Sequence, residues 1–239
     1  MDGWVPGVGD WGQNIWALWW TRKSLLVLGQ SPFFTQYLFY PNGVTLLFHP
    51  LDVTDGLIAL PLYGLVGGVG AYNVIVLLSY LLSGLGTYWL VTSLTHRRWA
   101  GWVAGLVFAF SPYHALRLAL GHLNLASMQW IPFYLLCLLL YIRHGRLRFA
   151  FLASVFMLLN ALCSWYYVFA CMLCTALMMG WYFVQPIGLR RLLARLTIIG
   201  VLTAAITAPL WLPMIQLMST TELVGAHNPL RHSVDLLSF

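Results

Sequence analysis

The chain has 239 residues, of which 61% are apolar and only 8% are charged, and its formal net charge is +6. Because a soluble domain carries roughly 25% charged residues, this composition excludes an ordinary water-soluble fold and indicates a protein that lies in lipid. The basic residues stand in short clusters between apolar runs, which favours a role in membrane topology and argues against nucleic-acid binding.

The N-terminal part of the chain is rich in aromatic residues but holds no apolar run long enough to cross a bilayer. Trp and Tyr are typical of the membrane–water interface, so residues 1–53 are expected to form an external loop with interfacial helices. The apolar stretch at 56–66 is too short to span and ends at the glycines of 67–70, so it predicts a short re-entrant or interfacial helix. A full-length span is expected at 72–94.

The remaining apolar runs predict further crossings. Spans are expected at 100–111, 125–142 and 196–218. The apolar run at 149–184 is far too long for one helix that rises about 1.5 Å per residue, so it is expected to turn round at Ser164–Tyr167. The predicted fold is therefore an all-α membrane protein, a polytopic transmembrane helix bundle with about six spans.

The placement of charge supports this count. Eight of the twelve Lys and Arg residues lie in three clusters, at 97–98, 143–148 and 190–195. The positive-inside rule places these clusters in the cytoplasm, and no acidic residue lies between 56 and 221. The chain is thus divided into an external loop at 1–53, a transmembrane helical domain at 54–218 and an external tail at 219–239. That tail is interpreted as the start of a truncated external region.

One group of polar residues lies near the start of the chain. Asp10 stands in GVGDWGQNIW, with Gln13 and Asn14 one helical turn later. An acid among Trp residues at a membrane interface can serve catalysis or hold a metal ion. The alternative is a capping box, in which Asp10 caps a helix and Gln13 reaches back to its start.

A second polar group precedes the short apolar helix. It consists of His49, Asp52 and Asp55. The two acids are spaced i, i+3 and would share one face of a helix. Asp55, or Thr54 before it, could equally cap the helix at 56–66.

The predicted external loop at 112–124 carries the third group. Arg117 is a base on the external side, and His114 would share its face if the loop is helical. His122 and Asn124 follow in GHLN. An Arg with two His near a membrane surface could bind a phosphate or pyrophosphate head group. In the alternative interpretation Arg117 only extends its charge to the interface.

Other chemistry finds little support in the sequence. The four cysteines lie inside apolar runs, and the CxxC formed by Cys171 and Cys174 is more typical of buried small residues than of a metal or redox site. The sequence holds no P-loop, dinucleotide-binding glycine motif, nucleophile elbow or HExxH zinc motif. A nucleotide-dependent enzyme is therefore not expected.

The order of several short motifs resembles a known group of enzymes. The motifs are GDWGQNIW, SPFFTQYLFYPNGV, HP, AYN, FSPYHALRLALGHLNL, SWYY and SVDLLSF. Together they extend over nearly the whole chain, and it resembles the prokaryotic multi-pass proteins of the GT-C glycosyltransferase superfamily. The resemblance implies transfer of a sugar from a polyprenyl-phosphate donor at the outer membrane face.

The resemblance also assigns roles to residues. The catalytic acid of such enzymes follows their first span, and Asp10 matches that position. Arg117 and His122 become candidates for the donor phosphate. Some members bind a divalent metal, so such an ion stays open as a cofactor. Only nine residues precede Asp10, so the chain is interpreted as a fragment that lacks the first span and the C-terminal part.

The sequence therefore predicts a glycosyltransferase-like protein of the prokaryotic plasma membrane and cell envelope, transferring hexosyl or pentosyl groups. Asp10 is the predicted catalytic base, and no metal ligand is assigned. The residues assigned to substrate binding are Gln13, Asn14, His49, Asp52, Asp55, His114, Arg117, His122 and Asn124. The expected partners are the polyprenyl-phosphate lipid and membrane lipids, and the oligomeric state stays open.

Two other classes of function compete with this prediction. A non-catalytic membrane scaffold would not depend on the external acids and histidines. A transporter would place ionisable residues in the middle of spans or show inverted repeats with broken helices, and neither pattern is present in the sequence.

Overall fold

The computed structural model describes residues 9–183 and 188–220. The expected external tail at 219–239 therefore lies almost wholly outside the described residues. The N-terminal part holds helix α1, Trp11–Arg22, which continues into a π-helical turn, Lys23–Val27. Two short strands follow, β1 (Phe34–Thr35) and β2 (Val44–Thr45), and they pair antiparallel.

Helix α2, Val53–Thr95, is interrupted at Gly67. This residue has φ 71° and ψ 179°, a conformation that side chains other than that of glycine avoid. The predicted glycine break is therefore confirmed. The segment before the break begins at Val53, earlier than the predicted 56, and packs against α1 through Ala59 and Leu18.

Three shorter helices follow: α3 (Arg98–Ala109), α4 (Pro112–Ala119) and α5 (Leu123–Ala126). Helix α3 packs closely along α2 because both present glycine at the contact. A Cβ atom on Gly105 would lie 2.7 Å from the carbonyl oxygen of Gly84. Ser111 caps α4 by accepting a hydrogen bond from the backbone N–H of His114.

The second half of the chain forms four helices: α6 (Trp130–His144), α7 (Leu147–Cys163), α8 (Trp165–Phe183) and α9 (Leu189–Thr220). Ser164 has extended backbone angles between α7 and α8, so the predicted reversal at this position is confirmed. The helices pack around a core that includes Tyr134, Leu138, Ala153 and Leu192.

The prediction of a helical membrane protein is confirmed. Among the described residues, four helical segments are long and apolar enough to cross a bilayer: Val53–Thr95, Leu123–His144, Trp165–Tyr182 and Arg190–Ser219. The count of six spans is not reached by this criterion. Helix α7 has 17 residues and α3 has 12, whereas a hydrocarbon core needs roughly 20.

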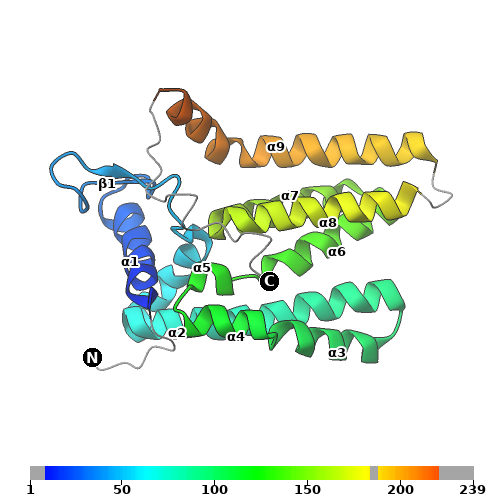
Figure 1. Ribbon diagram of the computed structural model, residues 1–239, viewed down its shortest axis with the longest axis horizontal. Coiled ribbons are helices and arrows are strands. Elements are labelled where there is room, and N and C mark those ends of the chain that lie inside the picture. Colours follow the sequence, from blue (N-terminus) through cyan, green and yellow to red (C-terminus); the bar gives the residue numbers. More distant parts are fainter. Residues whose placement is uncertain (1–8, 184–187, 221–239) are drawn as a thin grey trace, which may run out of the picture.

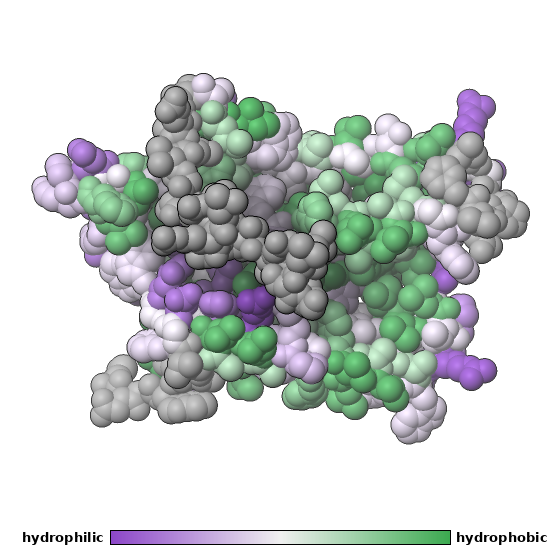
Figure 2. All heavy atoms as spheres, in the orientation of Figure 1, coloured by the Kyte–Doolittle hydropathy of each residue, from purple (hydrophilic) through white to green (hydrophobic). Residues whose placement is uncertain are grey.

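The two ends of the helix bundle differ in chemical character. The C-terminal ends of α2, α6 and α8 lie together on the right of Figure 1, whereas α1 and the strands lie at the opposite end. Arg143 Nη1 donates to Ser93 O over 2.7 Å, and Arg195 donates to Ile142 O. The arginine clusters therefore meet at one end of the bundle. Figure 2 shows mostly hydrophobic side chains between the two ends.

Candidate functional site

A cavity of about 770 Å³ opens at the end of the bundle that carries α1. Its polar lining contains six of the residues predicted from the sequence: Asp10, Gln13, Asn14, His49, His122 and Asn124. Its apolar lining comes from α7, α8 and α9 and from the segment around His49, and it includes Leu47, Phe48, Leu162, Trp165, Phe169, Leu210 and Met214. One cavity therefore offers both polar groups and lipid-like apolar groups.

Asp10 and His122 form an ion pair in this lining. His122 Nε2 lies 3.1 Å from Asp10 Oδ2, and the Asp10 side chain stays 60% exposed. Asp10 stands at the N-cap position of α1, but its carboxylate makes no capping hydrogen bond. Gln13 Nε2 donates instead to His49 Nε2 over 3.3 Å. The capping box considered for Asp10 and Gln13 is therefore wrong, and both side chains face other partners.

The geometry of the ion pair depends on Gly121, which has φ +73°. A Cβ atom there would lie 2.6 Å from the backbone nitrogen of Trp11, so only glycine lets the turn approach α1 so closely. Asn14 Nδ2 donates to Gly121 O over 2.6 Å and to Asp10 O over 3.0 Å. Asn14 thus ties the start of α1 to the turn that carries His122.

His49 lies in the segment between β2 and α2. Burial lowers the pKa of its imidazole below the usual range, because the charged form loses its hydration. The ring is therefore neutral at neutral pH and accepts the hydrogen bond of Gln13 through Nε2. A neutral His49 can position a substrate hydroxyl, whereas a permanent positive charge at this position is not expected.

Asp52 and Asp55 lie deeper, at the start of α2, and both are buried. Asp55 accepts hydrogen bonds from Ser127 Oγ and, over 3.2 Å, from Gln129 Nε2. Neither oxygen of Asp52 has a hydrogen-bond partner, and Asp52 does not cap α2 through its side chain. Burial and the nearby Asp55 carboxylate raise the pKa of Asp52 well above its usual range.

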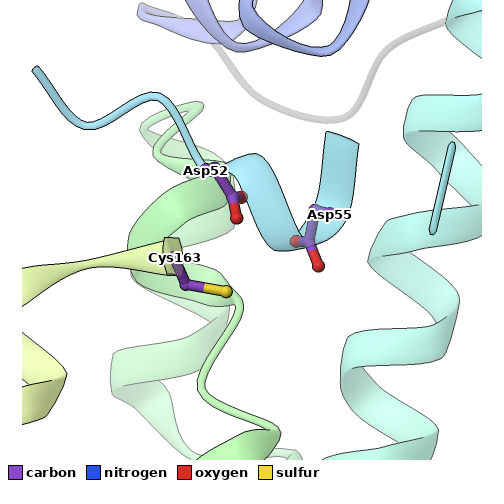
Figure 3. Close-up of side chains that lie close together, drawn as sticks. All are labelled: Asp52, Asp55 and Cys163. Carbon is purple, nitrogen blue, oxygen red and sulfur yellow. The ribbon is translucent and has the colours of Figure 1, made fainter. Parts of the chain in front are cut away.

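The thiol of Cys163 joins these two acids (Figure 3). One ligand atom from each of Asp52, Asp55 and Cys163 lies within 4.8 Å of the others. Cys163 ends α7 and also lines the cavity, so it connects the buried acids to that space. No functional role was predicted for Cys163, Ser127 or Gln129, because no local spacing in the sequence relates them to α2.

His114 and Arg117 are not part of the cavity lining. His114 is fully buried, and its ring stacks on that of Tyr80 at a centroid distance of 4.0 Å. Its Nδ1–H donates to Ala109 O and its Nε2 accepts from Ser79 Oγ, both over 2.8 Å. The Arg117 guanidinium lies 5.0 Å from the centre of the Tyr113 ring. Of the basic residues in this loop, His122 alone lines the cavity.

The helices and the cavity define a helical membrane protein with a pocket of mixed polar and apolar lining at one end. The chain belongs to the family described as "Domain of unknown function (DUF6311)", whose model matches residues 1–239. No curated protein and no solved structure matches the chain. The family description names no activity.

Proposed function

We propose that this protein transfers a sugar from a polyprenyl-phosphate donor at the outer face of a prokaryotic plasma membrane. The observation that carries the proposal is the mixed lining of the cavity. Asp10, His49 and His122 supply polar groups, while Leu210 and Met214 of α9 belong to the apolar lining. A ligand with a charged sugar-phosphate head and a hydrocarbon tail has the same mixed character.

Asp10 is suited to the part of general base. In the proposed reaction its carboxylate takes the proton of the acceptor hydroxyl, the acceptor oxygen forms a bond to the anomeric carbon, and the bond from that carbon to the phosphate oxygen breaks. The leaving group is the polyprenyl phosphate. His122 donates to Asp10 Oδ2 at the resting stage and so holds the carboxylate in place.

The departing phosphate carries negative charge that needs stabilisation by nearby donors. His122 is the basic side chain best placed for this, because it lines the cavity beside Asp10. Arg117 was the other candidate for the phosphate, but its guanidinium lies over Tyr113 and outside the cavity lining. We therefore assign phosphate recognition to His122 and leave Arg117 out of the site.

The orientation of the chain in the membrane is part of the same proposal. We propose six crossings, with α3 and α7 as short spans beside the four longer segments. Arginines from three successive turns lie at one end of the bundle, so an even number of crossings must separate neighbouring clusters. The cavity then faces the outside, where a lipid-linked sugar would be used.

Binding of a polyprenyl phosphate to the purified, detergent-solubilised protein tests the proposal. We expect saturable binding by the wild type, a loss of at least about tenfold in His122→Ala, and unchanged binding in the matched control Arg117→Ala. Absence of binding by folded wild-type protein would favour a non-catalytic scaffold. Equal losses in both variants would move the phosphate site away from the cavity.

A further inference from the structure

The group formed by Asp52, Asp55 and Cys163 has no role in the proposed sugar transfer. All three side chains are buried, with exposed fractions of 1%, 0% and 1%. They come from two helices that are far apart in the sequence: Asp52 and Asp55 lie at the start of α2, and Cys163 lies at the end of α7. Figure 3 shows that the side chains converge on one space.

The environment of the Asp52 carboxylate is unusual for a buried acid. Both of its oxygens lack a hydrogen-bond partner, although a buried carboxylate is normally paired, hydrogen-bonded or bound to a metal ion. Within the described part of the chain, the one ion pair joins Asp10 and His122, so no Lys or Arg neutralises Asp52. The backbone of Asp52 is in the left-handed region, with φ 50°. This conformation costs free energy in a residue other than glycine, and it sets the direction of the side chain.

We propose that Asp52, Asp55 and Cys163 bind one thiophilic divalent cation of the zinc class. A zinc ion sits roughly 2.3 Å from sulfur and about 2.0–2.2 Å from carboxylate oxygen, so its ligands lie within about 4.5 Å of one another. The ligand atoms of the three side chains lie within 4.8 Å of one another, so small side-chain shifts would bring them to that spacing. Magnesium and calcium prefer oxygen ligands throughout, which disfavours them beside a thiolate.

The surroundings of the cluster also fit a metal site. Ser127 and Gln129 donate to the two oxygens of Asp55 and fix its orientation, as outer partners do for metal-binding carboxylates. Gln129 Oε1 is buried and has no partner, so a further polar group is available close to Asp55. Cys163 lines the cavity, so a cation has a route of entry. This site is separate from Asp10 and does not depend on the proposed sugar transfer.

Titration of the purified, detergent-solubilised protein with Co²⁺ tests the site directly. Co²⁺ replaces Zn²⁺ in such sites, and its bond to a thiolate gives a charge-transfer absorption that carboxylates alone do not give. We expect one ion per chain, competition by Zn²⁺, and loss of the thiolate absorption in Cys163→Ser. The matched control is Cys171→Ser, a buried cysteine outside the cluster, which should keep the absorption.

A second variant covers the case in which Cys163→Ser does not fold. Asp52→Asn keeps the size of the side chain and should weaken cation binding by at least about tenfold, while the folded state is followed by gel filtration. Folded wild-type protein that binds neither Co²⁺ nor Zn²⁺ would overturn the proposal, and the two acids would then share a proton. Binding that is unchanged in both variants would overturn it as well, since the cation would then lie elsewhere.

Discussion

Replacement of Asp10 by Asn tests the proposed chemistry most directly. The change keeps the shape of the side chain but removes its negative charge and its ability to take a proton. His122 would then face an amide where it now donates to a carboxylate oxygen over 3.1 Å. Any loss of sugar transfer would therefore report the loss of the base and of its orientation.

The expected size of the effect follows from the exposure and contacts of Asp10. A general base typically contributes a factor of about 10² to 10⁴ to the rate, which is about 3–5 kcal/mol of barrier at roughly 1.4 kcal/mol per factor of ten. Folding should change by less than about 1 kcal/mol, because the Asp10 side chain is 60% exposed and makes no helix cap. Asp10→Asn should therefore lose most of its activity while keeping almost all of its stability.

The assay is release of polyprenyl phosphate from a set of polyprenyl-phosphate hexoses and pentoses, with thermal unfolding measured on the same samples. Asp10→Glu is the control, because it keeps a carboxylate while moving it and should retain part of the activity. Full activity of Asp10→Asn would refute the assignment of the base. A large loss of thermal stability in that variant would instead show that Asp10 supports the fold.

Two further predictions concern the fold that carries the site. Gly121→Ala should lower stability by at least about 1–2 kcal/mol and weaken polyprenyl-phosphate binding, because its φ is positive and its Cβ would meet the nitrogen of Trp11. Thermal unfolding checks this, and the control is Gly12→Ala in α1, which has open space and should keep or slightly raise stability. Phe39→Cys and Trp99→Cys, both highly exposed, should react with a membrane-impermeant thiol reagent from opposite sides of the membrane, and labelling from the same side would contradict the topology.

Much of the fold could be predicted because lipid limits the backbone to helices whose hydrogen bonds are satisfied within each segment. The apolar runs therefore gave the helices, and the exceptions were marked by particular residues such as Gly67 and Ser164. The crossing expected at 100–111 ends earlier, at Ala109, because Ser111 and Pro112 begin a new helix there. Hydropathy alone did not distinguish a short helix from a full span.

The candidate site was harder to predict because it depends on contacts between distant parts of the chain. His114 and His122 look alike in the sequence, yet Ser79 holds the first in the interior while the second faces the cavity. In the sequence Cys163 is one of four cysteines inside apolar runs, and only the packing of α7 against the start of α2 brings it to Asp52. No local pattern in the sequence contains this information.

The arginines at one end of the bundle have a consequence for the order of assembly. Arg143 donates to Ser93 O near the end of α2, and Arg195 donates to Ile142 O near the end of α6. These carbonyls are among the last of their helices, which lack partners within the helix itself. In the proposed topology, the same cations that orient each hairpin during insertion would later fasten it to the hairpin before it. A hairpin inserted in the opposite orientation would lose both the favourable placement of its charge and its hydrogen bond to the neighbouring hairpin. Orientation and docking therefore depend on the same residues.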